Sequence, residues 1–181
     1  MKLWLIRHAR PLIDAGVCYG VSDMPAEAAH TRDSAAQLAP LLPPGLQLWT
    51  SPLLRCTALA EALQAQRPDL QLRTDARLAE LDFGCWEGVR WDDIPRAAFD
   101  AWISDFGAAR FGGRESVNEL LQRVAAVRAE VQALGQDAAW VTHAGVLRAM
   151  ALLEQGHTTL STAPQWPREV AGWGEWEERS L

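Results

Sequence analysis

The chain begins with an apolar run, Leu3 to Ile6, which ends abruptly in Arg7 and His8. The run is too short to cross a membrane and has the length of a buried strand. Open α/β sheets bind ligands at the carboxyl ends of their strands. This strand therefore delivers a cation and a titratable nucleophile to a binding edge, although the pair taken alone also fits a strand that simply ends in solvent.

A second segment repeats this arrangement. Leu46 to Thr50 alternates as a strand does, and the following Ser51 and Pro52 predict the start of a helix with Ser51 as its N-cap. Arg55 then falls in the first helical turn, among free backbone N–H groups and at the positive end of the helix dipole. A cation gains no stability at that place, but it is well placed when an anion binds there.

A third segment places a histidine after another strand. Residues 138–142 predict a buried strand, His143 follows it, and a helix comes next. The carboxyl ends of parallel strands meet at one edge of a sheet. We therefore expect this edge to gather two arginines and two histidines: Arg7, His8, Arg55 and His143.

Strand and helix signals alternate along the whole chain. Strands are expected at 2–7, 46–50, 70–73 and 138–142, with an edge strand near 170–177. Helices are expected at 27–41, 53–66, 91–106, 115–134 and 145–154. This alternation predicts one α/β domain over 1–181, a three-layer α/β/α sandwich whose mostly parallel sheet is covered on both faces.

The expected helix at 91–106 is unusually aromatic. It carries Trp91, Phe99, Trp102 and Phe106. Two roles fit it equally well. It either packs against the domain or, with the turn that follows, forms a cap segment (91–114) over the active site.

The composition restricts the class of partner. The net charge of −6 argues against nucleic acid, because binding there depends on cations that neutralise phosphates. An acidic surface around an arginine-lined pocket instead suits a small anion. There is no long apolar run or leader pattern, and the three cysteines have no metal-site spacing, so we expect a cytoplasmic protein with no membrane association, no metal and no cofactor. The composition is also compatible with a homodimer.

Together these motifs resemble those of the histidine phosphatase (phosphoglycerate mutase-like) superfamily. Arg7-His8 matches the pair after the first strand, Ser51–Arg55 the second-arginine motif, and His143–Gly145 the second histidine turn. Glu80 precedes a Leu-Asp-Phe-Gly stretch that resembles the segment carrying the catalytic acid. The resemblance covers about residues 2–150 and implies a phosphoglycerate mutase-like fold.

Within this superfamily the chain looks most similar to the α-ribazole phosphatase branch, which acts in cobalamin biosynthesis. The similarity lies in Arg7–Pro11 and in the Cys-Tyr-Gly stretch of residues 18–25. By this resemblance Tyr19 and Gly20 line the substrate pocket, beside Arg7, Arg55 and His143.

The resemblance implies catalysis through a phosphohistidine. A phosphate monoester carries nearly two negative charges, which the planar forks of Arg7 and Arg55 can neutralise, with His143 as a third donor if protonated. His8 attacks with an unprotonated nitrogen while a backbone carbonyl holds the proton on the other, and nearby cations lower its pKa. Glu80 is the general acid, and the negative charge of a bound phosphate favours its protonated form.

Three further polar residues near these motifs have simpler roles. Asp82 and Glu87 are rival acids, but capping of the loop is the better interpretation for both. Arg10 either contacts the phosphate or holds its own loop, and the loop is slightly favoured.

The resulting prediction is a metal-independent phosphomonoesterase that acts on a small phosphate ester, with α-ribazole 5′-phosphate as the best single candidate. A broad-specificity sugar or small-molecule phosphatase stays open. So do a phosphoglycerate mutase-type isomerase, for which the chain looks short, and a protein phosphohistidine phosphatase. A non-catalytic phospho-ligand binding protein is supported only by departures from the family pattern at Ala9, Glu27 and Arg114.

Overall fold

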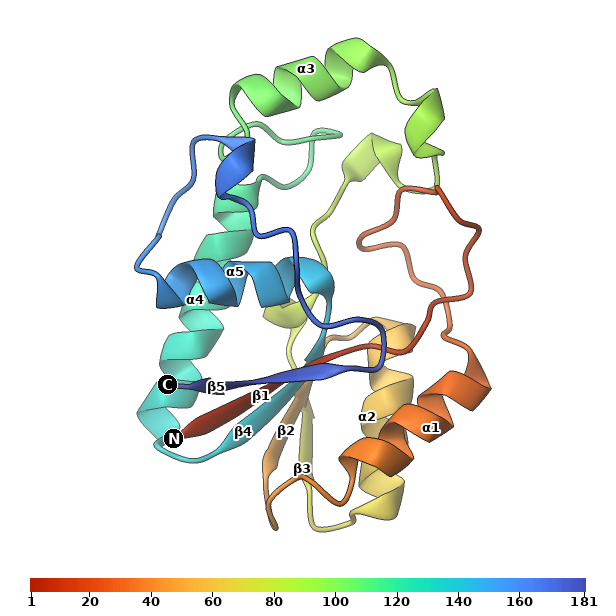
Figure 1. The fold of residues 1–181 in the computed structure, drawn as a ribbon, viewed down its shortest axis with the longest axis vertical. Coiled ribbons are helices and arrows are strands. Elements are labelled where there is room, and N and C mark those ends of the chain that lie inside the picture. The colour runs from red at the N-terminus through yellow and green to blue at the C-terminus, as the bar shows by residue number, and fades with distance from the viewer.

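The computed structural model describes residues 1–181 and contains one central sheet of five strands (Figure 1). The strands are β1 (Lys2–Arg7), β2 (Gln47–Thr50), β3 (Gln71–Thr74), β4 (Ala138–Thr142) and β5 (Trp176–Ser180). Their order is β3-β2-β4-β1-β5, with the first four parallel and β5 antiparallel to β1. The expected mostly parallel sheet is confirmed.

The position expected for the edge strand was wrong. It begins at Trp176, which pairs with Ile6, and continues to Ser180, opposite Lys2. The strand reads Trp-Glu-Glu-Arg-Ser. Charged residues are common on edge strands, because one side of the backbone faces solvent. Its polarity therefore hid the strand from a search for apolar alternation.

Five helices complete the layers. They are α1 (Ala28–Leu38), α2 (Leu54–Gln66), α3 (Arg96–Ser104), α4 (Val117–Leu134) and α5 (Ala144–Glu154). In Figure 1, α1 and α2 cover one face of the sheet, α4 and α5 cover the other, and α3 lies away from the sheet. The helix expected from residue 91 begins later, since residues 91–93 form a short 3-10 turn and Pro95 precedes α3. None of the helices combines the length and hydropathy required to cross a bilayer.

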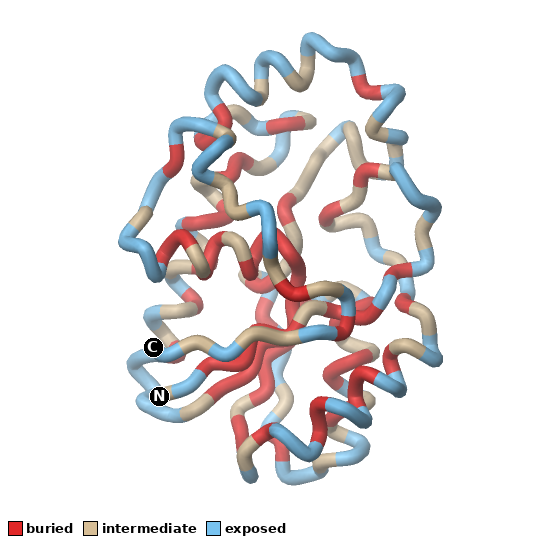
Figure 2. Tube along the Cα trace, in the orientation of Figure 1, coloured by how far each residue is buried: buried red, intermediate tan, exposed pale blue.

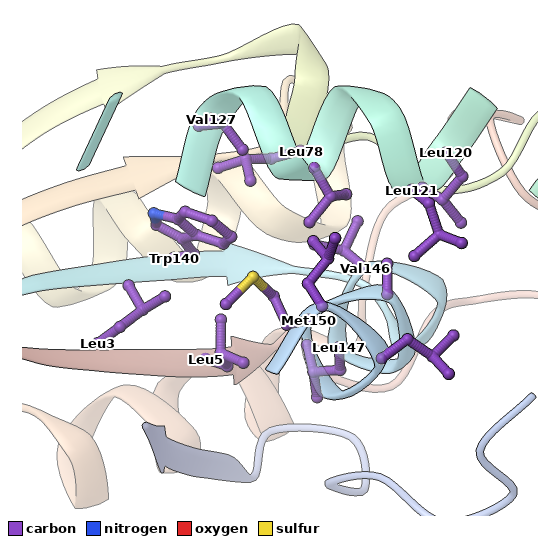
Figure 3. Close-up of a cluster of buried hydrophobic side chains, with 14 of the residues drawn as sticks. Leu3, Leu5, Leu78, Leu120, Leu121, Val127, Trp140, Val146, Leu147 and Met150 are labelled. Atoms are coloured by element: carbon purple, nitrogen blue, oxygen red, sulfur yellow. The ribbon is translucent and has the colours of Figure 1, made fainter. Parts of the chain in front are cut away.

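The sheet separates two apolar cores. Neighbouring residues of a strand face opposite sides, so Leu3 and Leu5 of β1 pack into the core under α4 and α5, and Trp4 and Ile6 into the core under α1 and α2. Figure 3 shows the first core, where Trp140 of β4 lies among these leucines and the side chains of the two helices. The buried strands at the centre of Figure 2 thus provide a rigid base for the site.

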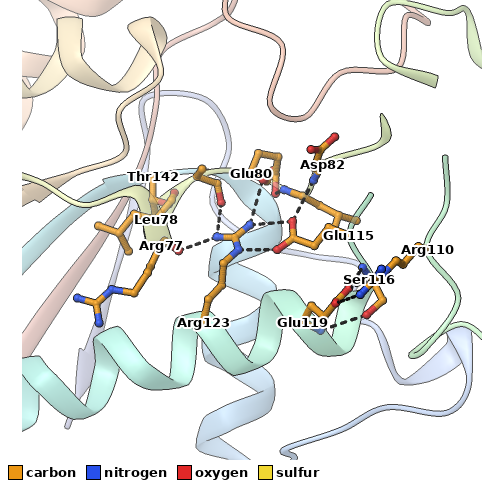
Figure 4. Close-up of polar contacts among 12 residues, drawn as sticks. Arg77, Leu78, Glu80, Asp82, Arg110, Glu115, Ser116, Glu119, Arg123 and Thr142 are labelled. Carbon is orange, nitrogen blue, oxygen red and sulfur yellow. Dashed lines mark hydrogen bonds and ion pairs between the residues drawn. The ribbon is translucent and has the colours of Figure 1, made fainter. Parts of the chain in front are cut away.

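The ends of α4 follow from local sequence. The Ser116 hydroxyl accepts a hydrogen bond from the Glu119 N–H at 3.2 Å, and the Glu119 carboxylate accepts one from the Ser116 N–H at 2.8 Å, which is a capping box (Figure 4). Gly135 ends the helix in the left-handed conformation at φ 64°. The helix starts two residues later than the expected position 115, because Ser116 is its cap.

Candidate active site

A cavity of about 390 Å³ lies at the carboxyl edge of the sheet, within the usual size of small-molecule sites. One part of its lining is polar and the rest is largely aromatic. The lining residues are Arg7, His8, Val17, Tyr19, Glu80, Leu81, Phe83, Trp91, Trp102, Phe106, Val117, Gly145, Arg148 and Trp166.

Strand register brings the two histidines together. Arg7 at the end of β1 pairs with Thr142 at the end of β4, so the residues that follow, His8 and His143, emerge side by side. Their ring centroids are 5.1 Å apart. The expectation that one sheet edge gathers both histidines is confirmed.

His8 has a defined protonation state. The ring is buried, and Nδ1 lies 2.7 Å from the backbone oxygen of Ala9. A carbonyl only accepts, so Nδ1 carries the proton and Nε2 is left unprotonated. Burial above all, and then the charges of Arg55 and Arg7, lower the pKa of His8 to about 3. The expected backbone partner and lowered pKa are both present.

Arg7 lines the cavity next to His8. Its Nη1 donates to the backbone oxygen of Ala171 at 3.1 Å, and its guanidinium carbon lies 5.5 Å from the centroid of the Trp173 ring. Its Nε is buried without a hydrogen-bond partner. Burial lowers the pKa of Arg7. An unpaired buried donor costs free energy, so an oxygen acceptor bound in the cavity would stabilise this side chain.

Arg55 lies behind the cavity and is fully buried. Its Nη1 donates to the backbone oxygen of Ser22 at 2.8 Å and its Nη2 to that of Gly20 at 2.5 Å, while its Nε has no partner. The guanidinium carbon is 5.5 Å from the centroid of the Tyr19 ring, which lines the cavity. In this structure Arg55 thus acts on the site through its charge and holds the 20–22 loop.

Gly20 supports Arg55 and does not line the cavity. A Cβ at this position would lie 1.8 Å from the backbone oxygen of Leu81, so only glycine fits. The expected contact of Gly20 with substrate stays a prediction.

The start of α2 differs from the expected one. Ser51 is not the N-cap, because the helix begins at Leu54 with Leu53 as its N-cap. The Leu54 N–H instead donates to the Asp23 carboxylate at 2.7 Å. Asp23 lies far away in the sequence, so a local reading could not find this cap. The Ser51 hydroxyl accepts a long hydrogen bond from the Leu53 N–H at 3.4 Å and has a second, closer partner.

His143 is that partner. Its Nε2 lies 2.8 Å from the Ser51 hydroxyl and 3.4 Å from the Cys56 sulfur. Burial, and then the charges of His8 and Arg55, lower its pKa well below the usual value. These influences favour the neutral ring of His143, which has a single N–H donor.

Glu80 lines the cavity and is oriented by two backbone amides. One carboxylate oxygen accepts from the Leu81 N–H at 2.9 Å and the other from the Gly145 N–H at 3.0 Å. A Cβ on Gly145 would lie 2.0 Å from Glu80 Oε1, so the glycine of the second histidine turn allows the Glu80 carboxylate to approach.

Arg123 of α4 holds the loop that carries Glu80 (Figure 4). Its Nη1 donates to the backbone oxygens of Arg77 and Ala79 at 2.6 and 2.7 Å, and its Nη2 to that of Glu80 at 3.0 Å. The Glu115 carboxylate pairs with its Nε at 2.6 Å. The sequence analysis missed Arg123, because its partners are backbone atoms distant in the sequence.

Asp82, Glu87 and Arg10 have the loop-stabilising roles that the sequence analysis favoured. Glu87 accepts from the backbone amides of residues 20–22 and of Phe83, and Asp82 accepts from the Gly84 amide at 2.8 Å. Arg10 pairs with the exposed carboxylate of Glu27 at 3.4 Å. All three stabilise loops.

Aromatic residues of the expected cap segment form one wall of the cavity. Trp91, Trp102 and Phe106 line it. Trp102 also stacks on Phe111 with a centroid distance of 4.4 Å. The segment therefore packs against its own loops and borders the cavity; its closure over a ligand stays a prediction.

Arg148 was not identified as a site residue, although it lines the cavity with Arg7. It lies three residues after Gly145 on α5, so both share one helix face, and this spacing is the signal that could have found it. Histidine, cysteine and carboxylate side chains form no group of three or more that could hold a metal ion.

Comparison with known proteins agrees with this architecture. The model of the histidine phosphatase superfamily (branch 1) matches residues 3–179, so the match extends through the tail that sequence motifs left unassigned. A mycobacterial glucosyl-3-phosphoglycerate phosphatase superposes with a TM-score of 0.81 at 24% identity, covering 98% of this chain and 88% of that one.

Two further structures are similar. The VO3 complex of the mycobacterial glucosyl-3-phosphoglycerate phosphatase has a TM-score of 0.83 at 22% identity, with 99% and 90% coverage of the two chains. TTHB049 from Thermus thermophilus has a TM-score of 0.65 at 31% identity, with 82% and 81% coverage. A search of curated proteins by sequence found no match.

Proposed function

The chain belongs to the histidine phosphatase superfamily, and from this premise we propose that it hydrolyses small phosphate monoesters through a phosphohistidine on His8. The observation that carries the proposal is the tautomer of His8. The Ala9 carbonyl accepts a hydrogen bond from Nδ1–H at 2.7 Å, so Nε2 has a free lone pair next to Arg7 in the cavity.

The first half of the reaction transfers the phosphoryl group. His8 Nε2 attacks phosphorus, the bond from phosphorus to the ester oxygen breaks, and that oxygen takes a proton from protonated Glu80. Arg7, Arg55 and His143 stabilise the negative charge of the transferring group. Their positions are set by strand ends and helix starts, so little reorganisation is needed.

The second half restores the enzyme. Water attacks the phosphohistidine, Glu80 accepts the proton of the water, and the nitrogen–phosphorus bond breaks to release inorganic phosphate. His8 and protonated Glu80 are then ready for another cycle. In this scheme the positive charges come from side chains, so no metal ion is required.

For the substrate, α-ribazole 5′-phosphate remains the best single candidate. The support is the subfamily resemblance around Tyr19 together with the aromatic wall, which suits a planar heterocycle. A broad-specificity phosphatase for sugar or glycerate esters is the second candidate, and the fold shared with the glucosyl-3-phosphoglycerate phosphatase favours it.

The test of the reaction class is hydrolysis of p-nitrophenyl phosphate, with and without EDTA, by the wild type, His8→Ala and His157→Ala. His157 lies beyond α5 and outside the cavity, so its variant is the matched control. We expect EDTA to have no effect and only His8→Ala to lose activity. Retained activity in His8→Ala would refute the phosphohistidine mechanism.

The substrate test compares α-ribazole 5′-phosphate with sugar phosphates and 3-phosphoglycerate by kcat/KM. A preference of more than tenfold for the ribazole ester supports the first candidate, and similar values support the second. Conversion between 2- and 3-phosphoglycerate in the presence of 2,3-bisphosphoglycerate would instead show a mutase. Binding of these esters without turnover would show a binding protein.

A further inference from the structure

Arg148 is fixed at one end and free at the other. Its Nε donates to the backbone oxygen of Pro167 at 2.8 Å. Neither Nη atom has a hydrogen bond or ion pair with the protein, and neither is buried without a partner, so both are open to a ligand. The side chain lines the cavity that holds His8.

No ion pair neutralises Arg148. Glu80 is the carboxylate of the cavity, and its two oxygens accept from backbone amides, with no ion pair to Arg148. Arg7 lies in the same cavity, and its like charge opposes that of Arg148. Two arginines thus face one cavity, and both favour an oxygen ligand.

Arg148 and Arg7 occupy different positions in the cavity. Arg148 also lines a second hollow with Phe106 and Trp166, and this hollow contains neither His8 nor Arg7. Phe106, Arg148 and Trp166 line both hollows, so Arg148 stands on the side of the cavity that adjoins the second one.

We propose that Arg148 is a specificity-determining residue that donates its free Nη–H groups to oxygen acceptors on the alcohol part of the substrate. These acceptors are either sugar hydroxyls or a carboxylate. The inference rests on the proposed phosphatase activity. A guanidinium held by Pro167 binds such oxygens through charged hydrogen bonds, and an ester without acceptors leaves these donors unused.

The experiment compares kcat/KM for three esters in the wild type and in Arg148→Met. Phenyl phosphate has no acceptor on its alcohol part, ribose 5-phosphate has hydroxyls, and 3-phosphoglycerate has a carboxylate. We expect kcat/KM for phenyl phosphate to change less than about threefold, and that for at least one acceptor-bearing ester to fall by about 10- to 100-fold. The ester that loses more identifies the acceptor.

Arg128→Met is the matched control. Arg128 is a half-buried arginine of α4 whose Nη1 donates to the backbone oxygen of Leu153 at 3.1 Å, and it does not line the cavity. Arg128→Met should leave the ratios of kcat/KM among the three esters unchanged. If Arg148→Met does not fold, as judged by thermal unfolding, Arg148→Lys replaces it, since lysine keeps the charge and loses the planar fork.

In an active enzyme, two outcomes overturn the inference. An equal loss on all three esters places Arg148 with the phosphate-binding groups or with the fold, and no loss on any ester leaves it without a role in selection. If the wild type hydrolyses none of the esters, the proposed function fails, and the inference fails with it. That result differs from the one in which the wild type is active but Arg148→Met leaves the ratios of kcat/KM among the esters unchanged.

Discussion

The two sides of the cavity are built in opposite ways. The floor, which consists of Arg7 and His8 lining the cavity with Arg55 and His143 buried behind them, comes from strand ends and helix starts. Its side chains hydrogen-bond to nearby backbone or hydroxyl groups. The roof, residues 91–111, contains a helix without a single buried residue and is seen in Figure 2 as a largely exposed arc. Its aromatic rings pack on one another and on the rings of Phe83, Trp86 and Trp166.

This difference suggests a division of labour. Charges held in a rigid, desolvated floor can stabilise a reacting phosphoryl group without reorganisation. Aromatic rings on an exposed helix supply shape and apolar surface that can change without disturbing the sheet. Floor variants should therefore lower kcat, and roof variants should mainly change KM.

The largest effect is expected at the nucleophile. His8→Ala removes the only proposed covalent step, so kcat for p-nitrophenyl phosphate should fall on the order of 10⁴-fold or more. Wild type denatured in alkaline detergent during turnover, a treatment that preserves phosphohistidine, should carry phosphate on His8, and the variant should carry none. A labelled intermediate in the variant would move the nucleophile elsewhere.

Variants of Arg55 test whether a positive charge behind the cavity raises kcat as much as a positive charge that lines it. Arg55→Met should lower kcat by on the order of 10²–10³, by analogy with the loss of one oxyanion donor. Since Arg55 also holds the 20–22 loop, thermal unfolding must be measured alongside. Arg55→Lys, which keeps the charge, should recover part of kcat; no recovery would indicate that only the loop contacts matter.

Arg123 tests the support of the acid. Arg123→Met removes three hydrogen bonds to the backbone of residues 77–80, so Glu80 should be less well positioned. We expect kcat to fall about tenfold for esters with poor leaving groups, and much less for p-nitrophenyl phosphate, which needs little protonation. Equal losses on both kinds of ester would show a general loss of structure.

Substitutions in the roof should have a smaller effect than those in the floor, and they should change KM and not kcat. Trp102→Ala removes a ring that lines the cavity, so KM for an aromatic ester should rise about three- to tenfold while kcat stays within about twofold. Ile103→Ala is the matched control, because Ile103 is an exposed neighbour on α3 that does not line this cavity. A fall in kcat without a change in KM would contradict the division of labour.

The smallest expected effect is on the pH dependence of the free energy of unfolding. His8 and His143 have lowered pKa values in the folded protein, whereas the unfolded chain protonates its histidines near pH 6.5. Below that pH the unfolded state binds more protons, so stability is lost as the pH falls, approaching about 1.4 kcal/mol per pH unit for each histidine. Urea unfolding between pH 7 and 5 should show a shallower slope for His8→Gln than for the wild type. An unchanged slope would mean that the histidine is protonated in the fold.

The sequence was most informative for the floor. Arg7 and His8 follow an apolar strand, and His143 follows another, so local pattern plus the rule that ligands bind at strand ends was enough to bring them together. The observed pairing of Arg7 with Thr142 confirms this placement. The order and type of most helices and strands could be predicted for the same reason, since apolar periodicity depends only on neighbouring residues.

The sequence was least informative where a residue's partner is distant. Asp23 replaces Ser51 as the group that caps α2, Arg123 holds the loop of Glu80, and Arg148 reaches the cavity from α5. Only for Arg148 does spacing offer a signal, because it lies three residues after Gly145 on α5; the other two contacts join residues that are distant in the sequence. The polar strand β5 belongs with them, because only its pairing with β1 makes it a strand.

By itself, then, the sequence determined the alternation of strands and helices and the sheet edge at which Arg7, His8 and His143 meet. Only the tertiary structure decided the tautomer of His8, the buried position of Arg55 and the free donors of Arg148. The physical reason is that apolar periodicity is set by neighbouring residues, whereas hydrogen-bond partners and desolvation are set by whatever the folded chain places nearby.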